Sequence, residues 1–404
     1  MSSKRILVRA SIILAIGGLV ALSLRSPDRR PADLSWLMEP DGTGVWRELL
    51  DDFQKKHPNV RVRLVEGPPA TDAREEMYSS SFLSGDAAYD IVYADVIWIP
   101  KFAAAGWLMD LTGLVSPADR EDYLPADLEA GMYHGRLYRV PAYTDAGVLY
   151  YRKDLVPQPP ATFDQLADLS ERLKTQDRYG FLWQGKQYEG LVTVYLETLW
   201  GFGGDWIDSE TRRVFLDSPE ALEALEFLRK AIGTISPPAV TTYAEEETRL
   251  LFQNDRSVFL RNWPYVWTLL EQTLRKDGRA GVAPVVHAPG HSSASTLGGW
   301  GFAISRFTQN PDAARQLVEF LTRPEQLSRI QLRLGRIPAR KRLVPPEFAP
   351  ILKSARVRPE IAEYAQASDI LQRWLSAALT GRVTSKTALL KATRETRALL
   401  GNVR

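Results

Sequence analysis

The sequence predicts an α/β protein built from two or three domains or lobes. The chain has 404 residues, which is more than a single compact core usually organises. Hydrophobic residues make up 45% and charged residues 25% of the chain, and this balance excludes disordered, collagen-like and polytopic membrane proteins. From residue 34 onward, segments with the alternation of strands are interspersed with segments that have the spacing of helices. Two lobes imply a cleft in which a ligand can bind.

The first part of the chain carries both periodicities. Apolar residues recur at helical spacing over residues 45–53, and then Val60, Val62 and Leu64 alternate with arginines as in a half-buried strand. Further predicted elements are strands over 34–38, 89–94 and 147–151 and a short helix over 102–108. This order is typical of the α/β class.

The second half carries clear helix start signals. Thr162 and Gln165 have the spacing of a capping box, and Ser218 and Asn310 each precede a proline at a predicted first helical position. Short strands are predicted over 258–260, 282–286 and 302–304. No linker rich in Gly or Ser separates the lobes, so we expect the chain to cross between them more than once through short hinges.

The N-terminus has the pattern of an export signal. Lys4, Arg5 and Arg9 precede an apolar run over residues 10–24, which has the length of a signal-peptide core and is shorter than the ~20 residues of a membrane-spanning helix. Small residues at 21–23 are compatible with cleavage, and an uncleaved anchor is the alternative. We therefore expect residues 1–30 to be a signal peptide or N-terminal membrane anchor, and the folded body to work outside the cytoplasm.

Composition and motifs exclude several kinds of chemistry. The net charge of +2 is too small to hold nucleic acid by its phosphates, and a chain without cysteine has neither disulfides nor thiolate sites. His287 and His291 flank a Pro-Gly pair, residues 201–204 lack the third glycine of a dinucleotide loop, and no G-x-S-x-G elbow is present. We expect no cofactor and no metal. A pair of carboxylates for glycoside hydrolysis stays open, which keeps a secreted glycoside hydrolase as the alternative function.

Acidic and aromatic residues gather in loops and at strand ends. Asp41 follows one predicted strand and Asp95 ends another, where ligands bind in open α/β sheets. Asp145 lies in the segment 141–147, before the predicted strand 147–151. Trp263 and Trp300 lie in later loops. A saccharide presents apolar C–H faces, which suit an indole ring, and a rim of hydroxyls, which suits carboxylates as charge-assisted acceptors. These residues favour a neutral sugar as ligand.

The chain resembles the extracellular sugar-binding proteins of ABC importers (solute-binding family 1), in particular the maltose/trehalose-type branch. The resemblance rests on residues 89–98 (YDIVYADVIW), 102–107 (FAAAGW), 145–155 (DAGVLYYRKDL), 262–264 (NWP) and 297–300 (LGGW). It is collinear from about residue 34 to the C-terminal helices. Two departures are the missing lipid-bearing cysteine of this family and the run Glu360–Tyr364 after Pro359.

The resemblance implies a two-lobed, periplasmic-binding-protein-like fold of class II, with the ligand in the cleft between hinged lobes. The implied lobes are residues 31–143 plus 301–342 and residues 144–300 plus 343–404. The implied sugar contacts are Glu39, Asp41, Arg74, Asp95, Tyr143, Asp145, Glu245, Trp263, Gly299, Trp300 and Arg358. On this basis we expect a monomer that is not an enzyme. It would capture a di- or oligosaccharide such as trehalose or maltose in the periplasm or at the outer face of the membrane, and deliver it to the permease subunits of an ABC transporter.

Overall fold

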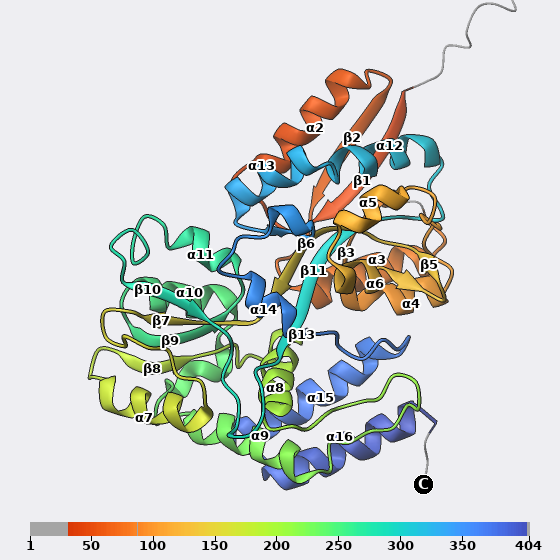
Figure 1. Cartoon of the computed structure of the whole chain (residues 1–404). Coiled ribbons are helices and arrows are strands. Elements are labelled where there is room, and N and C mark those ends of the chain that lie inside the picture. Colours follow the sequence, from red (N-terminus) through yellow and green to blue (C-terminus); the bar gives the residue numbers. More distant parts are fainter. Residues whose placement is uncertain (1–30, 87, 402–404) are drawn as a thin grey trace, which may run out of the picture.

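The computed structural model describes residues 31–86 and 88–401. The predicted export signal at residues 1–30 lies outside this range. The described chain folds into two lobes joined by extended strands (Figure 1), as the sequence predicts. No helix within the described residues has the length and apolar character needed to cross a membrane.

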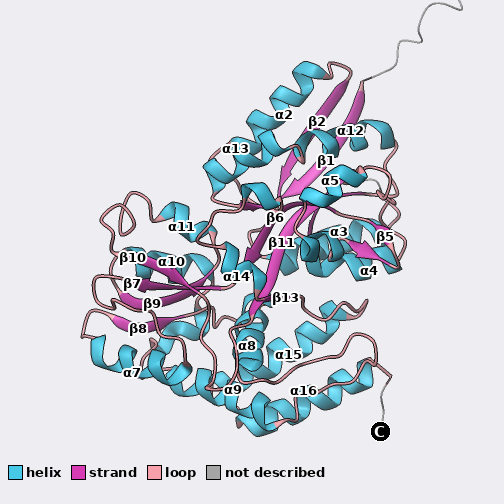
Figure 2. Cartoon of the chain, viewed as in Figure 1, coloured by secondary structure: helices cyan, strands magenta, loops and turns pink. Residues whose placement is uncertain are grey.

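The first lobe contains a mixed sheet with helices on its faces (Figure 2). Its strand order is β12-β6-β11-β3-β1-β2, and β13 pairs with one end of β11. The strands β1, β2 and β3 are parallel, whereas β11 runs antiparallel to β3 and β6. The strands are β1 (Ala32–Met38), β2 (Val60–Glu66), β3 (Ile91–Asp95), β6 (Val140–Ala146), β11 (Ser295–Ile304), β12 (Ile337–Pro338) and β13 (Ala355–Arg356). The helices are α2 (Val45–Lys56), α3 (Thr71–Leu83), η1 (Val96–Trp98), α4 (Ile99–Ala104), α5 (Pro117–Asp122), α6 (Pro125–Glu129), α12 (Pro311–Leu321), α13 (Pro324–Leu334) and η3 (Lys341–Leu343), beside the hairpin β4 (Met132–Tyr133) and β5 (Arg136–Leu137).

The second lobe is built on a smaller sheet of order β10-β7-β9-β8. Most of its helices lie on the side of this sheet away from the first lobe (Figure 1). The strands are β7 (Val148–Arg152), β8 (Tyr179–Leu182), β9 (Ser257–Asn262) and β10 (Ala280–Ala283). The helices are α7 (Phe163–Leu173), α8 (Glu189–Gly201), α9 (Pro219–Ala231), η2 (Pro238–Thr242), α10 (Glu245–Gln253), α11 (Tyr265–Leu269), α14 (Ala349–Lys353), α15 (Tyr364–Leu379) and α16 (Ser385–Leu399).

Each lobe has its own hydrophobic core. In the first lobe, Trp36, Trp46 and Phe302 pack edge to face with ring centroids 5.3 to 6.2 Å apart, an arrangement that aromatic quadrupoles favour. In the second lobe every residue of α8 is buried, because this helix is enclosed by α9, α15 and the end of β11. Separate cores let the lobes move as units about the strands that connect them.

The hinge strands are fastened to a buried ion pair. Glu197 of α8 accepts bonds from Arg261 Nε at 2.7 Å and Arg261 Nη2 at 2.5 Å, and also from the backbone N–H of Thr296 at 3.1 Å. Gly147, between β6 and β7, lies so close to this carboxylate that a Cβ would collide with it. The two polypeptide crossings at residues 147 and 296 therefore share one charged anchor.

Several sequence predictions are confirmed by the structure. The strands over 34–38, 89–94, 147–151 and 258–260 and the helix over 45–53 overlap β1, β3, β7, β9 and α2. Thr162 and Gln165 form a complete capping box at α7, and the Ser218 hydroxyl accepts from the Ala221 N–H at α9.

Other predicted boundaries are wrong, each for a local reason. The helix expected over 102–108 is α4, which ends at Ala104 because Gly106 adopts the left-handed φ of +69°. The strand expected over 282–286 ends before Pro284, which has no N–H to donate to a ladder. The strand expected over 302–304 is only the end of β11, whose glycines hide the pattern. Asn310 precedes α12 but makes no side-chain cap; it donates to the Asp33 carbonyl instead.

We expect Glu197→Ala to lower the free energy of unfolding by about 3–5 kcal/mol, because it leaves the buried Arg261 guanidinium unpaired. Urea unfolding followed by tryptophan fluorescence measures this loss. Glu171→Ala, which removes an exposed pair with Lys174, is the control and should cost less than about 1 kcal/mol. Equal effects of the two substitutions would refute the anchoring role of Glu197.

Candidate functional site

The register of three strands brings much of the predicted site into one row. Trp300 of β11 lies opposite Tyr143 of β6 on one side and Asp95 of β3 on the other. Asp145 lies opposite Gly298 two positions further along. Because side chains alternate between the faces of a sheet, Tyr143 and Asp145 point to the same side. The part of these strands nearest the second lobe therefore carries aromatic and acidic groups together.

The Trp300 side chain is packed among other side chains and does not form an open stacking surface. Its ring stacks on Tyr93 with centroids 5.0 Å apart and meets Trp98 edge-on at 5.1 Å. The Arg74 guanidinium lies 4.6 Å from the centroid of the indole. With 8% of its surface exposed, Trp300 offers mainly an edge to a ligand.

Arg74 and Glu39 connect the first loop to Trp300. Arg74 donates to the carbonyls of Pro68 and Pro69 at 2.8 Å and lies 3.6 Å from the Glu39 carboxylate. The backbone carbonyls hold the guanidinium in place. Its remaining donors are left for the acid or for a ligand hydroxyl.

Asp145 is an almost fully buried carboxylate with spare acceptor capacity. Its Oδ1 has no hydrogen-bond partner among the described residues, and its Oδ2 lies 3.8 Å from Arg336 Nη1. Burial raises the pKa of Asp145 to about 7, although Arg336 opposes the rise. Glu39, Asp127 and Asp95 add to the rise by charge repulsion. A hydroxyl donor would satisfy the unpaired oxygen.

The second lobe contributes Trp263 from the opposite side. Its indole Nε1 donates to Glu245 Oε1 at 3.2 Å, and the Arg261 guanidinium lies 4.2 Å from its ring. A Cβ on Gly298 would lie 3.2 Å from Asp145 Cβ and 3.3 Å from Trp263 Cζ3. Trp263 therefore packs over the glycine-rich strand beside Asp145, with one face supported by Arg261.

Gly299 is required by its backbone. Its φ of +133° is rarely adopted by other residues, and a Cβ would lie 2.7 Å from the Tyr143 carbonyl oxygen. The close approach of β6 and β11 at this point depends on the missing side chain.

Arg358 links the two lobes through carboxylates. Its Nη2 lies 3.3 Å from Asp95 of β3, and its Nη1 donates at 2.7 Å to Glu189, the first residue of α8. Glu189 also accepts from the Tyr364 and Ser368 hydroxyls. Burial alone would lower the pKa of Arg358, but Tyr364, Asp95 and Glu189 raise it above its usual value. The cation is therefore permanent.

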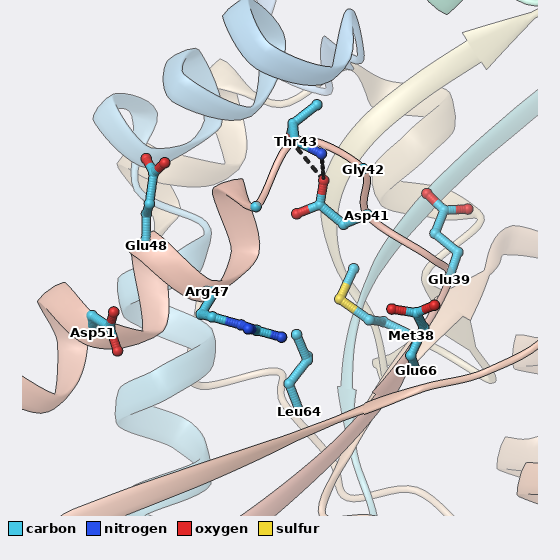
Figure 3. A pocket seen from close by; sticks show the side chains of 11 residues that line it. Met38, Glu39, Asp41, Gly42, Thr43, Arg47, Glu48, Asp51, Leu64 and Glu66 are labelled. Carbon is cyan, nitrogen blue, oxygen red and sulfur yellow. Dashed lines mark hydrogen bonds between the residues drawn. The ribbon is translucent and has the colours of Figure 1, made fainter.

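Asp41 lies apart from this row and acts as a cap. Its Oδ1 accepts from the Thr43 N–H and hydroxyl, and its Oδ2 accepts from the Trp46 N–H at 3.2 Å. With Glu39 it lines a pocket of about 490 Å³ between α2 and the ends of β1 and β2 (Figure 3). The Asp41 carboxylate therefore uses its oxygens to cap the start of α2.

Two residues of the candidate site, Arg336 and Glu189, were not predicted from the sequence. Arg336, between α13 and β12, donates to Glu39 at 3.0 Å, and nothing in its sequence neighbourhood marks it except Gly335 and Pro338. Glu189 did carry a signal, since with Glu197 it is one of two charges in an otherwise uncharged helix, and buried charges require partners. Among the described residues, no group of His, Asp and Glu side chains is arranged to bind a metal ion.

The chain is similar to known proteins in both sequence and fold. Residues 39–327 match the family model described as bacterial extracellular solute-binding protein. A probable ABC transporter-binding protein of Deinococcus radiodurans is 33% identical over 329 residues, which cover 78% of each chain. The maltose-bound MalE3 of T. maritima superimposes with a TM-score of 0.86 at 36% identity, covering 91% of this chain and 100% of that one. The GacH receptor of Streptomyces glaucescens, at 21% identity and a TM-score of 0.81, shares the fold over 92% of this chain and 99% of its own.

The family model spans most of the described chain, and the Deinococcus relative covers more than two thirds of it. The fold is that of two-lobed sugar-binding proteins. The chain belongs to the bacterial extracellular solute-binding proteins.

Proposed function

We propose that this protein captures a neutral di- or oligosaccharide between its lobes and delivers it to the membrane subunits of an ABC importer. The observation that carries the proposal is the group of Trp300, Asp145 and Trp263: Trp300 and Asp145 come from the paired strands β11 and β6, and Trp263 of the second lobe packs over Gly298 beside Asp145. Carboxylates and guanidinium groups beside aromatic rings suit the hydroxyl rim and the apolar face of a sugar. The named ligands of the relatives, maltose in MalE3 and maltotriose in a Pyrococcus abyssi protein that is 25% identical over 74% of this chain and 64% of its own, support an α-linked glucose saccharide. Trehalose is included in this class.

The binding residues in this proposal are the eleven positions named from the sequence, with Arg336 added. Glu39, Arg74, Asp95 and Tyr143 come from the first lobe, Asp145, Gly299 and Trp300 from the strands β6 and β11 that lead into the second lobe, and Glu245, Trp263 and Arg358 from the second lobe. Asp41 contributes by holding the first loop through its bonds to α2.

Lobe closure is the proposed mechanism of capture. Contacts from both lobes stabilise the closed arrangement only when a sugar bridges them. The ligand therefore shifts the population toward closure. The separate hydrophobic cores support two lobes, for which the proposed bounds are residues 31–143 plus 301–342 and 144–300 plus 343–404; Trp300, at a boundary, packs with the first core. No covalent step is part of this mechanism. Export by residues 1–30, as signal peptide or anchor, would bring a monomer to the periplasm or the outer face of the membrane, where it meets the permease.

The function is tested by incubating the protein with maltose, trehalose, maltotriose, sucrose and glucosylglycerol. We expect at least one of them to raise the unfolding temperature and to bind in calorimetry, because a ligand that binds only the folded state stabilises it. Free glucose should not accumulate. Glucose release would instead show a glycoside hydrolase, and binding of none of these sugars would refute the proposal.

We expect Asp145→Ala to weaken binding of the cognate sugar by about 10- to 100-fold, because a buried ligand hydroxyl would lose its acceptor. Isothermal titration calorimetry measures the change. Asp33→Ala, which removes an exposed carboxylate at the start of β1, should leave affinity unchanged. Unchanged affinity of the Asp145 variant would remove this residue from the site.

Sugar affinity should rise with pH through the titration of Asp145. The pKa of this carboxyl is about 7 in the free protein, so below neutrality it is largely protonated and a weaker acceptor. A bound hydroxyl favours the carboxylate, so affinity increases as the pH rises from about 5.5 to 8. Calorimetry at several pH values tests this, and Asp145→Asn should flatten the profile. An equally steep profile in that variant would assign the dependence to another group.

A further inference from the structure

The residues on either side of Arg336 fix its position between the two lobes. It follows Gly335, whose φ is +69° and whose Cβ, if present, would lie 3.0 Å from the Tyr265 carbonyl oxygen and 2.7 Å from the Thr268 hydroxyl. The next residue, Ile337, pairs with Thr144 of β6. The turn is therefore fixed against α11 of the second lobe on one side and against the hinge strand on the other.

The guanidinium of Arg336 lies between two aromatic rings. Its central carbon is 5.0 Å from the Tyr143 ring of the first lobe and 5.1 Å from the Tyr265 ring of the second. The Tyr265 hydroxyl donates to Glu246 at 2.7 Å, which holds that ring in place. Cation–π contacts with these two rings help to position the charge, while its nitrogens contact carboxylates.

The edge of this guanidinium meets the two carboxylates nearest the sugar site. Nη2 is 3.0 Å from Glu39 and Nη1 is 3.8 Å from Asp145. Glu39 has a second cation, Arg74. For Asp145, Arg336 is the one cation within 4 Å among the described residues. Arg336 remains charged, since Tyr143, Glu39 and Asp145 outweigh the effect of burial and raise its pKa well above the usual value.

We propose that Arg336 sets the charge selectivity of the cleft, so that it admits neutral saccharides and rejects amino sugars that carry a protonated amine. This inference rests on the proposed sugar-binding function. Uncompensated carboxylates would prefer an ammonium to a hydroxyl, because charge-assisted hydrogen bonds are the stronger kind. A fixed cation beside the same carboxylates removes this advantage and opposes a second positive charge, which is specificity by repulsion.

The first test compares matched sugars on the wild-type protein. Calorimetry at about pH 7, where a sugar amine is still largely protonated and Asp145 is partly ionised, is run with maltose and its 2-amino analogue maltosamine, and with trehalose and its 2-amino analogue trehalosamine. We expect the neutral member of the bound pair to bind at least about tenfold more tightly. Equal or tighter binding of the amino sugar would overturn the role of Arg336 while leaving sugar binding intact. Binding of none of the four sugars would overturn both proposals.

The second test changes the charge. R336M keeps much of the length of the side chain and removes the cation, and we expect the ratio of amino-sugar to neutral-sugar affinity to rise by about 10- to 100-fold. R336K keeps the charge and should keep the wild-type preference. R333M removes the same charge from α13, where Arg333 pairs with Glu48 at 3.2 Å, and should leave the ratio unchanged.

Each outcome of the second test decides the proposal. The same ratio in R336M as in the wild type, or the same shift in R333M, overturns it. Thermal unfolding checks that each variant is folded. If R336M does not fold or binds no sugar, the wild-type and R336K ratios decide, because a lysine variant that favours amino sugars contradicts a role for the charge.

Discussion

The antiparallel pairing of β6 with β11 is the constraint on which the rest of the structure depends. These strands are neighbours within the first sheet, and both continue to the second lobe. Their register places Tyr143 beside Trp300 and Asp145 beside Gly298. A shift of one residue would turn every one of these side chains to the other face. The strands that position the proposed binding residues are thus also the strands that connect the lobes.

Charge compensation is the second organising feature of the cleft. Buried carboxylates and guanidinium groups are each costly alone, so they occur here in contacting sets: Glu39 with Arg74 and Arg336, Asp95 and Glu189 with Arg358, and Glu197 with Arg261. Arg261 also supports the ring of Trp263. The aromatic surface of the second lobe is therefore connected, through one guanidinium, to the carboxylate that holds the hinge strand at Thr296.

The sequence predicts the parts of this site that depend on local pattern. Asp95 could be placed because it ends an apolar strand, and Asp145, Trp263 and Trp300 because they stand in short motifs. Arg336 could not be found in this way, because its importance comes from Glu39 and Asp145, which lie 297 and 191 positions away in sequence. The strand predicted from the sequence at β11 is too short for a different reason. Gly298, Gly299 and Gly301 break the hydrophobic alternation where the backbone itself must approach β6 closely.

The pair Asp95–Arg358 shows that some groups of the candidate site already satisfy one another. Asp95 ends β3 of the first sheet, and Arg358 lies 3.3 Å from it while donating to Glu189 at the start of α8. A ligand hydroxyl that donates to Asp95 would exchange one charge-assisted bond for another, so the gain on binding is smaller than the strength of the new bond. Asp145 differs, because its Oδ1 has no partner among the described side chains and backbone groups. A hydroxyl that reaches Asp145 satisfies an acceptor instead of displacing a donor, and this asymmetry makes Asp145, more than Asp95, the acid from which the net free energy of sugar binding should come.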